Sequence, residues 1–336
     1  MPLVLDRRQV LDIFSEARDR KWVLPAFNAE NLTTVEAILQ AVKDRGKIIG
    51  IQNLPIIIGI TNNYPSRPQT VYYSQTRRWD IGLRLFLSDV SLLSSSPSPF
   101  AKLRVMIHLD HIQWDKDKEL LGWDMNSFSS IMFDASTLPF EKNIKKTIAF
   151  VKKNRDKIVI EGACDEISES VKDRSGNLAI PEIAERYFCE TGIDIIVANL
   201  GTEHRAHSSN LQYRGDLAQK ITERIGPHLC LHGTSSVLKE KLTSLFEQGI
   251  CKVNIWTALE RDSSPVLFQK MLTNAAKIVG YDNAKKLLSE KLLGQKTDYN
   301  SELSIDYFTT TYRQDIIFRK MKDIITEYLN IWYVLK

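Results

Sequence analysis

Residues 104–111 read RVMIHLDH, an apolar run of strand length that ends in two ionisable side chains, Asp110 and His111. The same pattern recurs along the chain, where short apolar runs rich in β-branched residues alternate with stretches of helical apolar spacing. Runs that are apolar at nearly every position are typical of parallel strands buried on both faces. The runs that we expect to form strands are 23–27, 56–61, 104–109, 130–133, 158–161, 193–198, 228–231 and 252–255.

The order of these elements predicts the fold class. Stretches 32–42, 143–153 and 236–248 carry apolar residues at helical spacing, so we expect helices there. Strands that alternate with helices eight times favour an α/β fold, a (β/α)8 TIM barrel, over an open doubly wound sheet. The sequence has no G-x-G-x-x-G motif of the kind that opens a dinucleotide-binding sheet. We therefore expect a single domain over residues 1–336, with inserted segments at about 62–103 and 281–306.

Composition excludes several classes of partner. The net charge of +4, from 45 basic and 41 acidic residues, is too small to indicate nucleic-acid binding. No apolar run approaches the roughly 20 residues that a membrane span needs, and the N-terminus does not resemble a signal peptide. The four cysteines lie far apart without a C-x-x-C pair, which is typical of reduced thiols. We expect a cytoplasmic protein with no nucleic-acid and no membrane partner.

Polar residues gather directly after the expected strands. In a (β/α)8 barrel these positions converge on the C-terminal mouth, where active sites lie. The sequence therefore predicts a site built from side chains that are far apart along the chain. The residues at these positions are Asn28, Asp110, His111, Asp134, Asp165, Glu166, Thr202, Glu203, His204, His232, Gly233, Thr234, Ser235, Ser236, Trp256 and Thr257.

Histidines follow three different expected strands, at His111, His204 and His232. Three imidazoles with one open position are typical of a catalytic zinc (Zn2+) site, although cobalt or iron also accepts nitrogen ligands. The alternative is that each histidine is only hydrogen-bonded, and we prefer that interpretation for the remaining three. Of these, His108 is expected to point inward with Asp110, and His228 to lie at the opposite end of the barrel; the third is His207.

Several motifs, taken together, resemble those of class II fructose-bisphosphate and tagatose-bisphosphate aldolases. IHLDH at 107–111 is similar to the third-strand signature, GTEH at 201–204 to Gly-Thr-x-His, and HGTS at 232–235 to His-Gly-(Ala/Gly)-Ser. AFNAENL at 26–32, the run 129–144 and KVNIWT at 252–257 are similar to the first, fourth and eighth strands of that family. The resemblance spans roughly residues 8–325 in the right order.

The resemblance implies a zinc-dependent aldolase that reversibly cleaves a ketose phosphate, with a place in carbohydrate metabolism such as glycolysis. The default reaction is fructose 1,6-bisphosphate to dihydroxyacetone phosphate and glyceraldehyde 3-phosphate. Zinc held by His111, His204 and His232 would stabilise the enediolate as a Lewis acid, and Asp110 would be the catalytic acid/base. The alternative for Asp110 is that it only orients a histidine.

Further residues follow from the same resemblance. Asp134 and Glu161 match carboxylates at a second or alternative metal position, or they are solvated groups at the mouth. Glu166 and Glu169 are two candidates for a catalytic acid on a loop. The candidate substrate-binding residues are Asn28, Thr61, Gly233, Ser235, Ser236, Asn254, Thr257 and Arg205, with Arg67, Arg214, Arg313 and Arg319 as further candidate cations.

The chain departs from the family pattern at four places. Gly-Ala-Ser-Gly reads GTSS at 233–236, Glu-x-Glu-Leu-Gly reads EGACD at 161–165, Arg205 replaces a glycine, and Trp256 replaces a small polar residue. These changes leave open an aldolase-like lyase acting on a different sugar, or a catalytically silent metal-binding barrel. Besides a small sugar phosphate, the resemblance implies a second copy of the chain as partner, in a homodimer or homotetramer.

Overall fold

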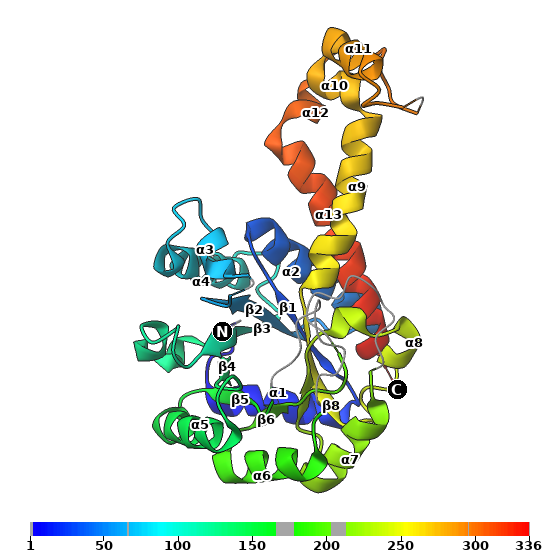
Figure 1. Cartoon of the computed structure of the whole chain (residues 1–336). Coiled ribbons are helices and arrows are strands. Elements are labelled where there is room, and N and C mark those ends of the chain that lie inside the picture. Colours follow the sequence, from blue (N-terminus) through cyan, green and yellow to red (C-terminus); the bar gives the residue numbers. More distant parts are fainter. Residues whose placement is uncertain (1–2, 66, 166–177, 203–212, 295, 336) are drawn as a thin grey trace.

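A closed barrel of parallel strands forms the core of the molecule (Figure 1). The computed structural model describes residues 3–65, 67–165, 178–202, 213–294 and 296–335. Within these residues eight strands pair in sequence order, and β8 closes the barrel against β1. They are β1 (Leu24–Asn28), β2 (Pro55–Thr61), β3 (Arg104–Gln113), β4 (Ser130–Asp134), β5 (Val159–Ala163), β6 (Ile195–Val197), β7 (Leu229–Leu231) and β8 (Ile250–Ile255).

The strands confirm the predicted (β/α)8 barrel. Nearly every strand residue is buried, as the continuous apolar runs indicated, and most strand boundaries lie within two residues of the expected ones. The third strand is the exception, because it continues past the expected end at residue 109 to Gln113.

A layer of helices covers the outside of the barrel (Figure 1). Its members are α2 (Leu32–Ile49), α4 (Trp79–Ser94), α5 (Phe140–Asn154), α6 (Pro181–Thr191) and α7 (Gly215–Ile225). The expected insertion 62–103 contains α3 (Gln69–Tyr72) and α4, and α4 is the helix that joins β2 to β3. Between β3 and β4 the chain, described throughout, forms two short 3-10 helices, η1 (Leu120–Gly122) and η2 (Met125–Ser127).

The prediction of a helix over residues 236–248 is mostly wrong. The structure has only η3 (Thr234–Ser236) and the single turn α8 (Lys239–Leu242), followed by turns up to β8. The hydroxyl groups of Thr243 and Ser244 donate to the carbonyl oxygens of Glu240 and Lys241. Side chains of this kind compete with the backbone for hydrogen bonds, which shortens the helix despite its apolar spacing.

The N-terminal end of the barrel is closed by α1 (Arg7–Asp19). Its first turn is capped by the Asp6 carboxylate, which accepts a hydrogen bond from the Gln9 amide. A cavity under α1 is lined by Phe14 and by residues at the starts of β6 and β8, together with His228. His228 therefore lies at the end of the barrel opposite the strand C-termini, as predicted.

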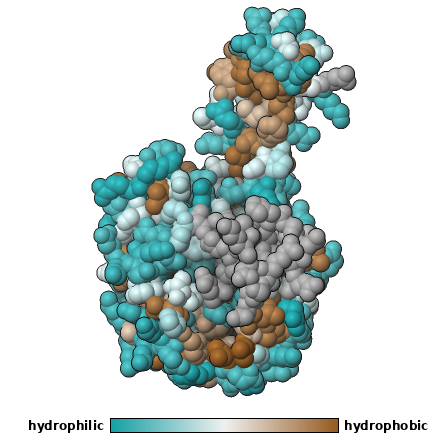
Figure 2. Space-filling view, viewed as in Figure 1, coloured by the Kyte–Doolittle hydropathy of each residue, from teal (hydrophilic) through white to brown (hydrophobic). Residues whose placement is uncertain are grey.

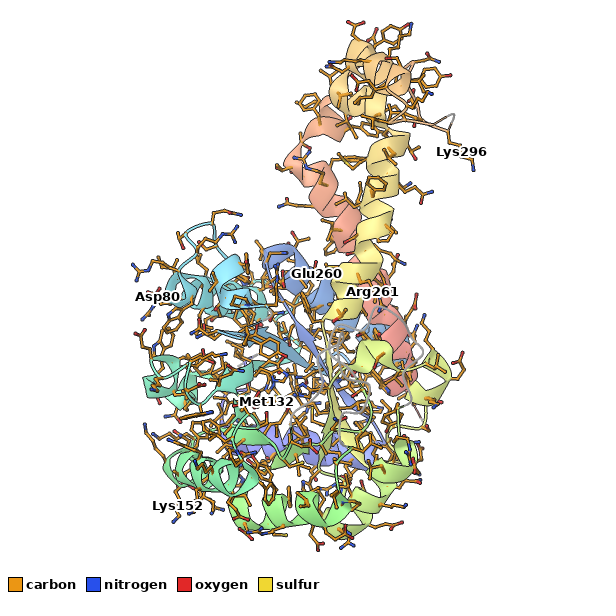
Figure 3. All side chains as sticks on the ribbon, viewed as in Figure 1. Asp80, Met132, Lys152, Glu260, Arg261 and Lys296 are labelled. Atoms are coloured by element: carbon orange, nitrogen blue, oxygen red, sulfur yellow. The ribbon has the colours of Figure 1, made fainter. Side chains whose placement is uncertain are left out.

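A helical arm projects from the barrel (Figure 1). Its two long helices are α9 and α13, and α13 continues down the side of the barrel against α2. The expected addition 281–306 forms much of its far end, and Figure 3 places Lys296 at the tip and Glu260 at the base. The elements of the arm are α9 (Thr257–Thr273), α10 (Ala275–Val279), α11 (Tyr281–Ser289), α12 (Ile305–Phe308) and α13 (Thr310–Trp332).

Two expectations from composition concern the cysteines and the helices. All four cysteines are free thiols, and Cys164 and Cys230 are buried. Among the described residues, no helix combines the length and the apolar character that crossing a bilayer requires.

Candidate metal and active site

A cleft of about 560 Å³ lies at the C-terminal mouth of the barrel. Most of the predicted site residues that the structure describes line it, although they come from strands far apart in the sequence. These residues are Asn28, Thr61, Asp110, His111, His232, Gly233, Ser235, Asn254 and Thr257. The convergence of strand ends predicted from the sequence is therefore present.

An irregularity in β3 lets two successive residues face the cleft. The pairing of β3 with β4 shifts register between Leu109 and Ile112, and His111 has a φ of 49°. Successive residues of a regular strand point to opposite faces, whereas a bulge re-aims a side chain. Asp110 and His111 therefore both line the cleft. Left-handed backbone at a non-glycine residue costs about 1–3 kcal/mol and is often found at functional sites.

Two histidines meet in the cleft, and each is held by a carboxylate behind it. Nδ1 of His111 lies 3.2 Å from Asp134 Oδ2, and Nε2 of His232 lies 2.8 Å from Glu161 Oε1. When those nitrogens donate their protons to the carboxylates, lone pairs remain on His111 Nε2 and His232 Nδ1. These two atoms are only 3.1 Å apart. Facing lone pairs repel, so this geometry fits a shared cation, with carboxylates orienting its imidazole ligands.

Electrostatics at the pair differ between the two rings. Burial lowers the pKa of His232, and the neighbouring His111 lowers it further, so that this ring is neutral near pH 7. Burial also opposes the charge of His111, but the carboxylates of Asp110 and Asp134 outweigh it and raise the pKa of His111. A metal ion bound at this pair would replace the proton that those carboxylates favour.

Asp110 lies beside this pair and is held by two amides. Its Oδ2 accepts a hydrogen bond from Asn28 Nδ2 at 2.7 Å, and its Oδ1 accepts one from Asn254 Nδ2 at 2.9 Å. Burial raises the pKa of Asp110, but His111 and the other nearby histidines outweigh it and hold the pKa well below its usual range. Asp110, His111 and His232 bring ligand atoms within 4.8 Å of one another, which makes them a possible metal-binding group.

The position of Asn28 depends on a glycine in the neighbouring strand. Gly59 on β2 is opposite Asn28 on β1, and a Cβ at Gly59 would lie 2.2 Å from Asn28 Oδ1. Gln69 contributes as well, because its Oε1 accepts hydrogen bonds from Asn28 Nδ2 and from the Thr61 backbone amide. The amide that holds Asp110 is thus fixed by close packing on β2 and by the loop that follows it.

Other predicted residues have structural contacts of their own. Gly233 has a φ of 65°, and its carbonyl oxygen accepts a hydrogen bond from the Ser236 hydroxyl. Ser236 is therefore buried beneath the turn, while Ser235 lines the cleft. Asp134 and Glu161 lie behind the histidines and do not line the cleft. The predictions for Glu166, Glu169, His204 and Arg205 lie outside the described residues.

Three contributors to the site were not predicted from the sequence. The Tyr64 ring stacks on His111 with centroids 4.6 Å apart, and nothing in the sequence around Tyr64 signals this contact. Gln69 and Lys252 also join the buried network below the cleft. Lys252 had a usable signal, since it is two residues before Asn254 in a strand and therefore shares the inward face.

Arg67 supplies a positive charge at the rim of the cleft. Among the described residues that line the cleft, it is the only lysine or arginine. Its Nε donates to Glu30 Oε1 at 2.7 Å, and its guanidinium lies 4.2 Å from the centre of the Tyr72 ring. Arg214, another candidate cation, instead pairs with the exposed Asp216.

Comparison with known proteins identifies the family. The family model for class-II fructose-bisphosphate aldolase matches residues 8–305. The chain belongs to this family. Fructose-bisphosphate aldolase of Giardia intestinalis is 24% identical over 334 residues, covering 91% of each chain. That of Staphylococcus epidermidis is 25% identical over 292 residues, covering 85% of this chain and 91% of the relative.

The class II aldolase fold is also found among solved structures. The fructose-bisphosphate aldolase of Campylobacter jejuni aligns with a TM-score of 0.76 over 99% of this chain and 96% of that one. The two sequences are 15% identical in that alignment, so the likeness concerns the fold.

Glu260 is a titratable group near Glu30 and Arg67, in the first turn of α9 at the base of the arm (Figure 3). Its Oε1 is buried and has no hydrogen-bond partner in the part of the chain that the structure describes. Burial, together with the charge of Glu30, raises the pKa of Glu260 to about 7. The folded protein therefore keeps a proton that the unfolded chain loses near the ordinary value of 4.5.

This difference predicts a pH-dependent effect of Glu260→Gln. Because the folded state binds the proton more tightly, Glu260 lowers stability progressively as pH rises from about 4.5 to 7. The variant should melt at the wild-type temperature near pH 4 and above it at pH 8, by on the order of 2 °C. Differential scanning calorimetry across this range measures the difference, with the exposed Glu240→Gln as control. A difference that does not change with pH would contradict the prediction.

Proposed function

We propose that this class II aldolase family member is a zinc-dependent enzyme that reversibly cleaves a ketose phosphate. Fructose 1,6-bisphosphate is the first substrate to test, with dihydroxyacetone phosphate and glyceraldehyde 3-phosphate as the products. The observation that carries the proposal is the pair of facing nitrogens on His111 and His232, 3.1 Å apart and beside Asp110.

The metal ligands in this proposal are His111, His232 and His204, the last of which lies outside the described residues. Zinc, when bound, supplies a Lewis acid that stabilises negative charge on the substrate as the carbon–carbon bond breaks. Asp134 and Glu161 orient two of the imidazoles through the nitrogen that faces away from the metal.

Asp110 is the proposed acid/base. In the cleavage direction it takes the proton of the hydroxyl group that becomes the aldehyde, and the electron pair of the broken bond stays with the ketone half. The amides of Asn28 and Asn254 keep the carboxylate oriented and ionised for this task. The carbon of the ketone half then takes a proton, for which Glu166 and Glu169 remain the two candidates.

The substrate would be bound by groups around the rim. Gly233, Ser235 and Thr257 offer amides and hydroxyls to one phosphate, close to the start of α9. Arg67 offers a cation to the other anionic end, because Nη1 is the guanidinium nitrogen that does not bond to Glu30. Asn28, Thr61 and Asn254 complete the proposed contacts, with Arg205 as a further cation.

Trp256 favours a second candidate, cleavage of a differently substituted sugar. It lines the cleft where the family pattern has a small polar residue, and its buried Nε1 has no hydrogen-bond partner among the described residues. A bulky indole where a small side chain is usual changes the shape of the cleft, and with it the sugar substituents that the cleft accepts.

An aldol cleavage assay over phosphorylated and unphosphorylated ketoses tests these proposals. We expect cleavage of bisphosphates, loss of activity with a chelator and recovery on adding zinc. Preference for another sugar would support the second candidate. Inactivity on every ketose by protein with zinc bound would overturn both and leave a catalytically silent metal-binding barrel.

Asp110→Asn separates proton transfer from metal binding. The amide keeps the size of the side chain but cannot take the proton, so kcat should fall at least ~10²-fold. Zinc measured by elemental analysis should stay near one per subunit, with Asp124→Asn at the exposed N-cap of η2 as the matched surface control. Loss of zinc together with activity would instead show that Asp110 acts by orienting the ligands.

Arg67→Met tests the anionic subsite. Loss of a charged hydrogen bond typically costs about 1.5–3 kcal/mol, so KM for a phosphorylated ketose should rise roughly 10-fold or more. KM for the same ketose without that phosphate should stay unchanged. Arg214→Met, which removes an arginine paired to an exposed aspartate, is the control. Equal changes in KM for both substrates would show that Arg67 does not recognise the phosphate.

We also propose that the chain assembles as a homodimer or homotetramer. Apolar side chains gather on the projecting arm (Figure 2), where Phe268, Leu292 and Ile305 are 66%, 63% and 67% exposed. Large exposed apolar patches are uncommon on monomeric proteins. Sedimentation velocity should give a multiple of the 38.5 kDa chain mass, reduced by Phe268→Ser with Ile305→Ser. A wild-type protein that sediments as a monomer at micromolar concentration would contradict this.

The cytoplasm is the proposed location. Cys164, Cys189, Cys230 and Cys251 are all free thiols, which fits a compartment that keeps cysteines reduced.

A further inference from the structure

Lys252 is a charged residue inside the barrel, below the cleft. It lies on β8, its side chain is completely buried, and it is among the largest fully buried side chains of the molecule. An ammonium group in such a place is unfavourable unless its charge and its three donors are satisfied. The contacts of the ammonium group therefore indicate its role in the structure.

Three contacts of the ammonium connect it to residues that hold the site above it. Nζ lies 2.6 Å from Asn254 Oδ1, 2.8 Å from Glu161 Oε2 and 3.3 Å from His108 Nε2. The other ring nitrogen of His108 is 2.9 Å from Ser130 Oγ. Burial and the charge of Lys252 lower the pKa of His108, so the ring is neutral and its Nε2 can accept the third proton.

We propose that Lys252 is the positioning residue of the acid/base and metal groups, an inference that rests on the proposed aldolase function. Because Nζ donates to Oδ1 of Asn254, the amide nitrogen of Asn254 faces Asp110. Without this donor the buried Oδ1 of Asn254 would keep only the weak thiol donor of Cys230 at 3.7 Å, so the amide that donates to Asp110 would be held at one end alone. Lys252 thereby fixes the hydrogen bond that holds one oxygen of Asp110.

The second effect of Lys252 is on the metal pair. Its charge balances Glu161, whose other oxygen accepts from His232 Nε2. That bond leaves His232 Nδ1 with a lone pair facing His111. Burial alone would raise the pKa of Glu161, but the charge of Lys252 and then the hydrogen bond from His232 hold it below its usual range.

Lys252 also bears on a possible second metal position. Glu161, Cys230 and His232 bring ligand atoms within 4.8 Å of one another. The ammonium lies 2.8 Å from the carboxylate and 3.6 Å from the Cys230 sulfur, so a positive charge is already present in this group. Glu161 in this arrangement orients His232 and balances Lys252.

The test uses Lys252→Met combined with Glu161→Gln. Lys252→Met alone leaves a buried carboxylate without its partner and is expected to fold poorly, whereas the double variant is neutral at both positions. Circular dichroism and thermal melting first establish that it folds. Cys251→Ala, one residue away and facing the cavity under α1, controls for disturbance of β8.

In the double variant we expect kcat to fall about 10²-fold while KM changes little, because orientation of the acid/base is lost and the rim is intact. Adding Asn254→Ala should then cause little further loss, since Lys252 acts through that amide, whereas independent effects would multiply. A folded double variant with kcat within threefold of wild type, or losses that multiply, would overturn the proposal.

Zinc affinity gives a readout that does not depend on the substrate. Groups that orient metal-binding histidines typically change affinity by roughly 10–100-fold, so Glu161→Gln and the double variant should both weaken zinc binding to that extent. Competition with a coloured chelator measures this even if wild-type protein cleaves no ketose phosphate. Unchanged zinc affinity in both variants would overturn the role of Lys252 at the metal pair, whatever the outcome for the proposed function.

Discussion

The site depends on one electrostatic constraint, the close approach of His111 Nε2 and His232 Nδ1 at 3.1 Å. Asp134 and Glu161 lie at hydrogen-bond distance from the opposite ring nitrogens, so the two facing atoms both carry lone pairs when those nitrogens donate. Either a proton on His111, whose pKa is raised, or a bound cation removes the repulsion between the facing atoms. The barrel keeps this arrangement in place because every ring and carboxylate sits on or directly after a strand, where hydrogen-bonded neighbours restrict movement.

The barrel tolerates a local distortion to present these groups. β3 carries the register shift after Leu109 and the left-handed backbone at His111, and these features bring Asp110 and His111 to the same cleft. A regular strand would put one of them on the outer face. The strain is offset by the buried contacts of β3 with β2 and β4, which define the path of the strand on both sides of the distortion.

Much of the fold followed from the sequence because burial and strand length leave a direct signal in it. The apolar runs located the strands, and the polar residues after them located Asp110, His111 and His232 at one mouth. The continuation of β3 to Gln113 could not be predicted, since the φ of His111 is set by its packing in three dimensions. The helix expected over 236–248 was wrong because apolar spacing does not report hydroxyl groups that bond to the backbone. Lys252 was not predicted as a site residue because lysines are almost never fully buried in proteins, whereas this one is.

Substitutions have different effects at the buried positions of the site and at the positions on its rim. Below the cleft, Lys252, Glu161 and Asn254 belong to one hydrogen-bonded network, in which replacing a single member leaves another buried polar group unsatisfied. At the rim, Arg67 Nη1 is not bonded to Glu30 and Trp256 Nε1 has no hydrogen-bond partner within the described part of the chain, so substitution there leaves the interior network unchanged. The departures of this chain from the family pattern at 233–236 and at Trp256 lie at this rim. Divergence at the rim can change what the cleft binds while the buried network that holds Asp110 and the facing nitrogens stays intact.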